Sequence, residues 1–311
     1  MTGGGSKGLL VVGDVVTDIV ARHRSPLATA TATDTAADIA TLPGGAGANV
    51  ACWAARSGAE DVRILARVGA DEVDAHERAL RAAGVRPRLV ADPAAPTGTV
   101  VCLVGADGER TFLTDSGAVL RLSTADWDGE LLAGVGHLHV SGYLFFADAS
   151  RAAARLAMDA ARARSIPVSI DPASAGFIAA FGTDRFLAAI AGADVLLPSH
   201  HEAALLTGRS GSADAAAELS RRFPLVVSTR GARGALVAAS GTVVARVPAR
   251  PATAVDTTGA GDAFTGGFLA ARLAGHDPVE AAGHGCRTAA EAVTVIGGRP
   301  RDPQGPEGRR R

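Results

Sequence analysis

The sequence has 311 residues, of which 47% are hydrophobic and 20% are charged, and its formal net charge is -1. This length and apolar content predict one large α/β domain with a smaller appendage. The balanced charge gives no general attraction to nucleic acid or anionic membranes, so neither is expected as a partner. No run predicts a membrane span, and the glycine-rich start does not resemble a signal peptide.

The cysteines and the single lysine narrow the possible functional classes further. Cys52, Cys102 and Cys286 are widely spaced and odd in number, which fits neither a disulfide framework nor paired metal-binding motifs and predicts a cytoplasmic location. Lys7 is the only lysine, and it lies in the glycine-rich start. P-loop enzymes and Schiff-base enzymes need a lysine in a packed site, so these classes are excluded.

Hydrophobic patterning divides the first half of the chain into short elements. The predicted elements are, in order, a buried strand over 9–20, an irregular excursion over 21–37, a strand over 38–42, a helical run over 44–57, a strand over 63–68 and a helix over 71–83. Two alternating runs, 98–104 and 110–114, flank the turn sequence Gly105-Ala106-Asp107-Gly108. They predict a hairpin in a small sheet set apart from the main fold.

Strands and helices alternate regularly in the second half. The predicted strands cover 137–140, 168–171, 195–198, 225–229, 235–239 and 243–247, and the predicted helices begin near Ser150, Ala175 and Ser212 or cover 260–273 and 279–293. This order predicts an α/β fold with a doubly wound, mainly parallel sheet flanked by helices.

The strongest chemical signal is the run Asp256-Thr257-Thr258-Gly259-Ala260-Gly261-Asp262-Ala263-Phe264, which follows a strand-like segment and opens a helix. The N–H groups of Gly259, Ala260 and Gly261 are expected to face a phosphate, which the helix dipole also favours. Asp262 is then suited to take a proton from an attacking hydroxyl. An isolated Gly-Ala-Gly-Asp string would fit a turn and a helix cap better.

The whole run, however, resembles the second signature of the phosphofructokinase B family, the ribokinase-like sugar and nucleoside kinases. Gly44-Gly45-Ala46-Gly47-Ala48-Asn49 is similar to the first signature, and Gly13 with Asp18 to the initial strand. The resemblance covers nearly the whole chain. It implies an ATP-dependent carbohydrate kinase with Mg²⁺, built as one ribokinase-like domain over 1–311. It also implies a small β lid from segments about 14–43 and 87–116, which would keep water from the reaction.

The same resemblance implies the binding residues. Acceptor hydroxyls would be held by Asp18, Gly45 and Asn49, the nucleotide and its Mg²⁺ by Ser199, Glu202, Thr229 and Gly231, and a monovalent cation such as K⁺ by Asp256, Thr258, Ala292, Val295 and Gly297. Ser199 stands where the family usually has asparagine, which weakens the predicted magnesium site. Thr229 and Gly231 fit an ordinary turn between strands equally well, and Asp256 also fits a loop-ordering carboxylate.

Three positions bear on the acceptor. Val16, Ala46 and Tyr143 stand where ribokinase proper has an Asn, a Lys and a Glu that contact the sugar. Ribose is therefore expected to be a poor acceptor, because a site without those polar partners leaves sugar hydroxyls unpaired. The more apolar pocket favours a sugar or sugar derivative, with a nucleoside stacked on Tyr143 as the alternative.

Two other classes compete with a kinase. A dinucleotide-binding oxidoreductase fits poorly, because its glycine fingerprint directly follows the first strand, whereas here residues 21–43 intervene. A non-catalytic sugar- or nucleotide-binding regulator is disfavoured by the intact Asp262 and its glycines. A homodimer through exposed lid strands is a further expectation.

Overall fold

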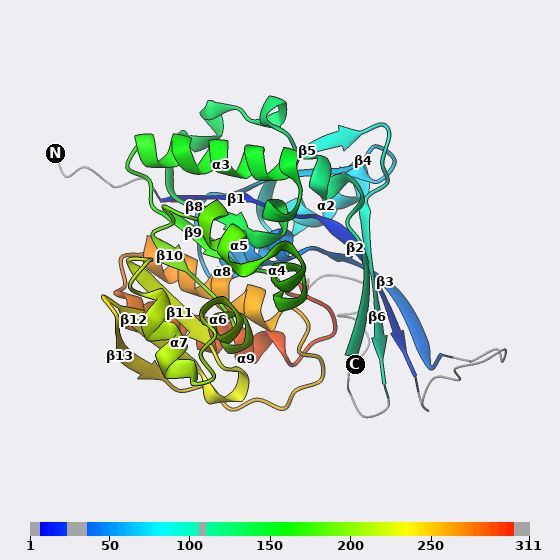
Figure 1. Cartoon of the computed structure of the whole chain (residues 1–311). Coiled ribbons are helices and arrows are strands. Elements are labelled where there is room, and N and C mark those ends of the chain that lie inside the picture. Colours follow the sequence, from blue (N-terminus) through cyan, green and yellow to red (C-terminus); the bar gives the residue numbers. More distant parts are fainter. Residues whose placement is uncertain (1–6, 24–35, 106–109, 302–311) are drawn as a thin grey trace.

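The computed structural model describes residues 7–23, 36–105 and 110–301. The described strands form a main sheet of nine strands and a small sheet of four (Figure 1). The main sheet has the order β13-β12-β11-β10-β9-β8-β1-β4-β5. Its strands are β1 (Gly8–Val12), β4 (Val62–Gly69), β5 (Val85–Asp92), β8 (Val135–Ser141), β9 (Val168–Asp171), β10 (Val195–Leu196), β11 (Leu225–Thr229), β12 (Ala235–Ala239) and β13 (Thr242–Val247). The strands from β11 to β5 pair in parallel and β12 pairs antiparallel on both sides, which confirms the predicted fold class.

Successive side chains on a strand point to opposite faces of the sheet, so each buried strand contributes to two cores. Helices cover both faces of the main sheet and enclose these cores. In β1, Leu10 and Val12 belong to one core, whereas Leu9 and Val11 belong to the other. The first core is covered by α3 (Asp148–Ala163), α4 (Ala175–Phe181), α5 (Thr183–Ala189), α6 (His200–Thr207) and α7 (Ser212–Leu219), and the second by α1 (Ala46–Arg56), α2 (Val73–Ala82), α8 (Ala260–Leu273) and α9 (Pro278–Ala292). None of the described helices is long and apolar enough to cross a membrane.

The small sheet projects from the carboxyl end of β1. It has the order β3-β2-β6-β7, formed by β2 (Val16–Arg22), β3 (Asp38–Gly44), β6 (Gly98–Val104) and β7 (Arg110–Asp115). Strand β2 pairs antiparallel with β3 and parallel with β6, and β6 and β7 form the predicted antiparallel hairpin. Figure 1 shows this sheet standing beside the main body, at the edge where the early parallel strands end.

Two predicted elements differ from the structure. The single strand expected over 9–20 is divided between the two sheets, because the chain turns over residues 13–15 to bring Asp14 against the start of α1. The predicted excursion over 21–37 begins later than expected, because β2 continues to Arg22. Residues 24–35 of this excursion and 106–108 of the predicted turn lie outside the described residues.

Among the described α-helices and β-strands, sequence reasoning missed three: β5, α5 and α6. Strand β5 alternates charged and apolar residues, and it pairs with β4 at the edge of the main sheet. Residues 87–92 therefore belong to the main sheet, and of the second predicted lid segment only the part from β6 onward enters the small sheet. Helix α6 is only eight residues long, and its apolar residues have almost no helical periodicity.

Candidate active site

Two cavities adjoin the N-terminus of α8. The large cavity, of about 590 Å³, lies between the carboxyl ends of β1, β8 and β9 and the small sheet. The small cavity, of about 420 Å³, lies between the end of β11 and helices α8 and α9. Thr258, Gly259 and Asp262 line the large cavity, and Thr257, Ala260 and Gly261 line the small one. The N-terminus of α8 therefore borders both cavities.

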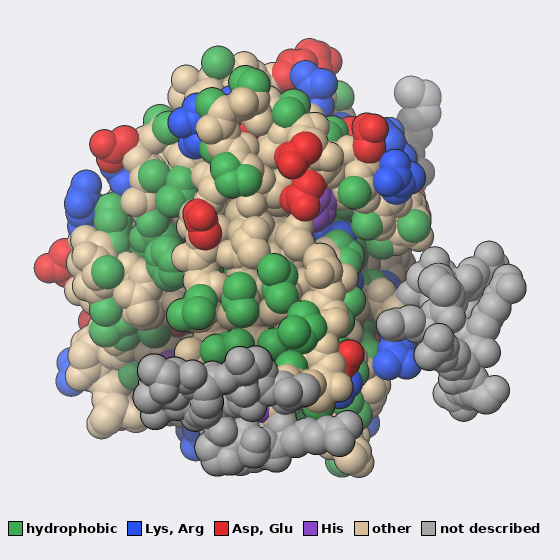
Figure 2. Space-filling view, turned by 90° about the vertical axis from the view of Figure 1, so that its right-hand side faces the viewer, with side chains coloured by type: hydrophobic (Ala, Val, Ile, Leu, Met, Phe, Trp, Pro, Cys, Tyr) green, Lys and Arg blue, Asp and Glu red, His purple; other side chains and the backbone are tan. Residues whose placement is uncertain are grey.

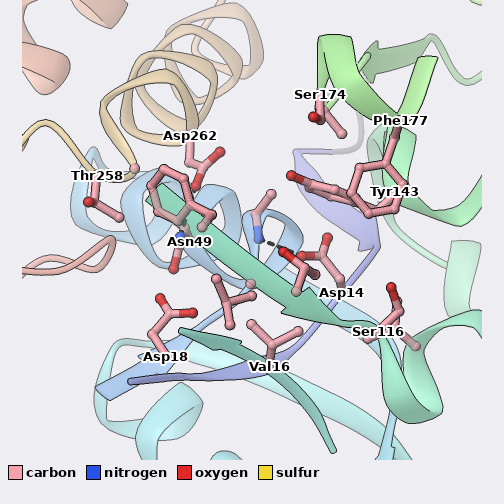
Figure 3. Close-up of a pocket in the computed structure, with 18 of the residues that line it drawn as sticks. Asp14, Val16, Asp18, Asn49, Ser116, Tyr143, Ser174, Phe177, Thr258 and Asp262 are labelled. Atoms are coloured by element: carbon pink, nitrogen blue, oxygen red, sulfur yellow. Dashed lines mark hydrogen bonds between the residues drawn. The ribbon is translucent and has the colours of Figure 1, made fainter. Parts of the chain in front are cut away.

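The three residues predicted to hold the acceptor all line the large cavity. Asp18 comes from β2, Gly45 precedes α1, and Asn49 lies one turn into α1. Figure 3 shows Asp262, Asn49 and Asp18 on one side of this cavity, with Tyr143 on the opposite side. The fold therefore brings the predicted acceptor residues together with the predicted base.

Asp14 fixes α1 at the end of β1. Its buried carboxylate accepts hydrogen bonds from the N–H groups of Ala46 at 2.7 Å and Gly47 at 3.0 Å, and from the Ser141 hydroxyl at 2.7 Å. Orphan amides at a helix start are thereby satisfied. Gly45 has a φ of 101°, and a Cβ there would lie 2.5 Å from the Asp14 carbonyl oxygen, so only glycine fits. Sequence reasoning assigned Asp14 no role.

The start of α8 is packed as closely as the start of α1. Gly259 has a φ of 70°, and a Cβ there would lie 2.5 Å from the Cα of Gly298. The Asp262 carboxylate accepts a 2.8 Å hydrogen bond from the Asn49 side-chain amide, which joins α8 to α1. The prediction that three N–H groups are free needs one correction, because the Ala260 N–H donates a long 3.3 Å bond to the Thr257 carbonyl.

Desolvation makes the Asp262 carboxyl a weaker acid than an ordinary aspartate. The pKa of this carboxyl is raised to about 7, chiefly by desolvation and also by the charges of nearby carboxylates, including Asp14 and Asp18. The hydrogen bond from Asn49 works in the opposite direction, because it stabilises the ionised form. A pKa close to neutrality is the value that suits a general base, since both protonation states are accessible.

Two other carboxyl groups of the large cavity also have raised pKa values. Desolvation raises the pKa of Asp18 to about 6, although the positive charge of Arg299 opposes this shift. Desolvation also raises the pKa of Asp171 well above its ordinary value, assisted by the charges of Glu202 and Asp262. The cavity is thus a region in which negative charge is poorly stabilised.

The residues predicted to hold the nucleotide divide into two groups. Thr229 and Gly231 line the small cavity. Ser199 and Glu202 line neither cavity and instead form a capping box at the start of α6. The Ser199 hydroxyl accepts from the Glu202 N–H at 3.3 Å, and the Glu202 carboxylate accepts from the Ser199 N–H at 2.7 Å. The Ser199 hydroxyl, at the position where the family usually has asparagine, therefore accepts a hydrogen bond within this cap.

Asp256 connects two of the loops predicted to hold a monovalent cation. Its carboxylate accepts from the N–H of Thr258 at 2.9 Å and from the N–H of Gly297 at 2.8 Å. Ala292 ends α9, and its carbonyl accepts a 3.2 Å bond from the N–H of Val295. The loop-ordering role considered for Asp256 is therefore present. The described residues contain no cluster of three or more metal-ligating side chains.

Comparison with known proteins decides the family. The pattern of the pfkB family carbohydrate kinase matches residues 6–304. The chain belongs to the pfkB family of carbohydrate kinases. A fructokinase from Klebsiella pneumoniae is 36% identical to this pfkB kinase over 244 residues, which cover 75% of this chain and 78% of the relative.

Solved structures agree with this assignment. An Escherichia coli protein in complex with ATP and Mg²⁺ has a TM-score of 0.82 at 25% identity, covering 94% of each chain. The adenosine kinase from Sinorhizobium meliloti has a TM-score of 0.84 at 23% identity, covering 95% of this chain and 96% of that one, and shares the fold. This pfkB kinase is an ATP-dependent enzyme that phosphorylates a hydroxyl group of a sugar or sugar derivative, as predicted.

Proposed function

We propose that Asp262 is the general base of this kinase. The observation that carries the proposal is its position in the large cavity at the helix terminus that also borders the small cavity, combined with a pKa of about 7. The acceptor hydroxyl gives its proton to the Asp262 carboxylate while its oxygen bonds to the terminal phosphorus of ATP. The bond from that phosphorus to the departing ADP oxygen breaks. The backbone of Gly259, Ala260 and Gly261 serves as the anion hole, assisted by the dipole of α8.

The acceptor hydroxyls are held by Asp18, Gly45 and Asn49. Asn49 offers direct support, because its side-chain oxygen is buried and has no hydrogen-bond partner within the described part of the chain. A buried acceptor without a donor is costly, and a hydroxyl of the bound sugar would satisfy it. The side-chain nitrogen of Asn49 meanwhile holds Asp262, so one residue positions both the base and the acceptor.

The nucleotide binds in the small cavity. Phe264, Cys286, Ala289 and Val293 provide an apolar surface for the base of ATP, while Thr229 and Gly231 lie at the polar edge, a combination common in nucleotide sites. The charge of Glu202 raises the pKa of both Asp171 and Asp262, and the charge of Asp262 also raises the pKa of Asp171, which supports a role for Mg²⁺ as a counter-charge beside them. K⁺ is proposed at Asp256, together with the backbone carbonyls of Thr258, Ala292, Val295 and Gly297.

A furanose or related polyol is the acceptor we favour, as in the fructokinase relative. A nucleoside is the second candidate, because the Tyr143 ring lies edge-on to Phe177 at 5.5 Å in the wall of the large cavity. Ribose is expected to be poor, since Val16 and Ala46 line the cavity where polar sugar contacts would be needed. Ala46→Lys alone is not expected to create a ribokinase.

The small sheet acts as the lid, and a second copy of this chain covers its outer face. Val16 and Asp18 of β2 face the large cavity, and the alternate positions face outward. On that outer side Ile39 and Leu113 are 65% and 58% exposed, and Figure 2 shows apolar side chains gathered on this part of the surface. Exposed apolar area of this kind favours a homodimer through the lid.

An ATP-consumption assay with Mg²⁺ tests the proposal. The panel includes fructose, ribose, other free sugars, sugar acids and nucleosides, with Asp262→Asn as the matched inactive control. We expect ATP use that depends on one acceptor and is lost in the variant. Acceptor-dependent ATP use that survives Asp262→Asn would remove this residue from the base role, and the highest kcat/KM on ribose would overturn the interpretation of the pocket.

A further inference from the structure

A groove lined by arginine side chains lies in the helix layer that covers the first core. It has a volume of about 460 Å³ and runs between α3 and α5. Arg151 and Arg155 come from α3 and Arg185 comes from α5, while Asp148 is the only acidic residue among the described lining residues. The whole chain has a net charge of -1. The groove is therefore a local concentration of positive charge on a protein that has no overall positive charge.

Backbone contacts hold the two arginines of α3 in place. Arg151 donates a 3.0 Å hydrogen bond to the carbonyl of Phe145 and forms an ion pair with Asp148. Arg155 donates a 2.7 Å hydrogen bond to the carbonyl of Ala191. These bonds use the terminal nitrogens, so the Nε of each arginine has no hydrogen-bond partner in the described part of the chain. Both guanidinium groups are thus positioned in advance and keep donors for an anion.

Arg185 is the least neutralised of the three arginines. It is exposed, and it has no ion-pair partner among the residues that the structure describes. Its guanidinium carbon lies 4.3 Å from the centre of the Phe181 ring, and that of Arg151 lies 5.3 Å from the same centre. Such cation–π contacts orient a guanidinium group without cancelling its charge. A phosphate group would supply the missing counter-charge, because guanidinium N–H groups bind phosphate oxygens in pairs.

Helix α4 lies between this groove and the large cavity. Phe181, its last residue, lines the groove, whereas Phe177 and Ala180 line the large cavity. The Phe146 ring contacts both phenylalanines of α4, with its centre 5.2 Å from that of Phe177 and 5.8 Å from that of Phe181. Phe177 also contacts Tyr143 in the cavity wall, at 5.5 Å (Figure 3). A continuous series of aromatic contacts therefore joins the groove to the proposed acceptor cavity.

We propose that the groove is a regulatory site for a small phosphate-bearing molecule, coupled to the large cavity through α4. The phosphate accepts hydrogen bonds from Arg155 and Arg185, and Arg185 in turn holds Phe181. With one end of α4 held, less conformational freedom remains to be lost when an acceptor contacts Phe177 at the other end. Each ligand should then tighten the binding of the other by the same factor, as linkage requires. The site itself does not depend on the proposed function, whereas its effect on the acceptor does.

Calorimetry with inorganic pyrophosphate tests the site. Because pyrophosphate also fits the proposed anion hole, the informative quantity is the difference between wild type and variants. Arg155→Gln combined with Arg185→Gln should weaken binding in the groove about tenfold or more, because charge-assisted hydrogen bonds are lost. Asp148→Asn should tighten it about two- to fivefold, since an exposed like charge is removed. Arg78→Gln is the matched control and should change nothing, because Arg78 is exposed on α2, which covers the opposite face of the main sheet.

Hydrogen exchange measures the coupling without any acceptor. Pyrophosphate should slow the exchange of the α4 amides in wild type and in Arg78→Gln, but not in the double arginine variant. An acceptor found in the ATP-consumption assay should bind about fivefold more tightly with pyrophosphate present, and pyrophosphate should gain the same factor from the acceptor. Competition by a sugar bisphosphate and by inorganic tripolyphosphate then distinguishes a sugar phosphate from a nucleotide phosphate chain as the source of the ligand.

The outcomes separate this inference from the proposed function. Equal pyrophosphate binding by wild type and the double arginine variant would overturn the site. Binding in the groove that leaves the exchange of α4 unchanged would overturn the regulatory role. If the groove binds pyrophosphate and slows exchange in α4 but no acceptor is phosphorylated, the inference stands and the proposed function falls. If an acceptor is phosphorylated and the groove binds no pyrophosphate, the proposed function stands and this inference falls.

Discussion

Replacement of Asp262 by asparagine should have opposite effects on stability and on turnover. It removes a carboxylate that destabilises the fold at high pH, and it removes the proposed general base. The folded-state pKa of about 7 lies about three units above the ordinary value of 3.8. At about 1.36 kcal/mol per unit, ionisation costs the folded state at most about 4 kcal/mol. Because the carboxylate borders the cavity, water there should reduce this cost to about 2–4 kcal/mol.

The sign of the effect follows from the direction of the shift. A carboxyl whose folded-state pKa is raised stabilises the fold fully below pH 4, and this contribution is lost as pH rises through about 7. Asparagine cannot ionise, so Asp262→Asn should be more stable than wild type at pH 8 and about equal at pH 4. Turnover should fall by a factor on the order of a hundred to ten thousand, the usual contribution of a general base.

Urea unfolding at pH 4 and pH 8, together with steady-state kinetics at saturating acceptor, measures both effects. Asp92→Asn is the control, because its effect on stability at pH 8 should have the opposite sign. The Asp92 carboxylate accepts from Arg67 at 2.8 Å and from Arg121 at 2.6 Å, which holds its pKa well below the usual range. Its stabilising contribution is present above the unfolded pKa, so this variant should be less stable at pH 8. If Asp262→Asn is also destabilised there, Asp262 is a structural cap and the reasoning is refuted.

Three further predictions address the residues around this site. Asn49→Leu removes the hydrogen bond that lowers the pKa of Asp262, so the acidic limb of the kcat/KM profile should move to higher pH; an unmoved limb contradicts this. Wild-type turnover should rise several-fold when K⁺ replaces tetramethylammonium at constant ionic strength, and Asp256→Asn should lose that response. Equal rates in both salts would leave Asp256 as a loop-ordering residue. Leu113→Asp should convert a dimer to a monomer in analytical ultracentrifugation, whereas a monomeric wild type would exclude the lid dimer.

Much of the site could be predicted because its signals are local. The glycine run before Asp262 and the Gly44 to Asn49 run each specify a close backbone approach at a helix start, and both helices form where expected. The Ser199 and Glu202 pair shows the limit of such signals. Their spacing fits a ligand pair and a capping box alike, and the structure has the capping box.

The sequence by itself determined the alternation of strands and helices, the β6–β7 hairpin of the small sheet and the family. These features depend on side-chain periodicity and on glycine conformations, which act over a few residues. Only the tertiary structure decided that the run over 9–20 is divided between two sheets and that Asp14 caps α1. It also decided that Asp262 has a pKa of about 7, because that value depends on desolvation and on charges far away in sequence. The cluster of carboxyl groups in the large cavity has the same origin, since residues 14, 18, 171 and 262 meet only in the folded chain.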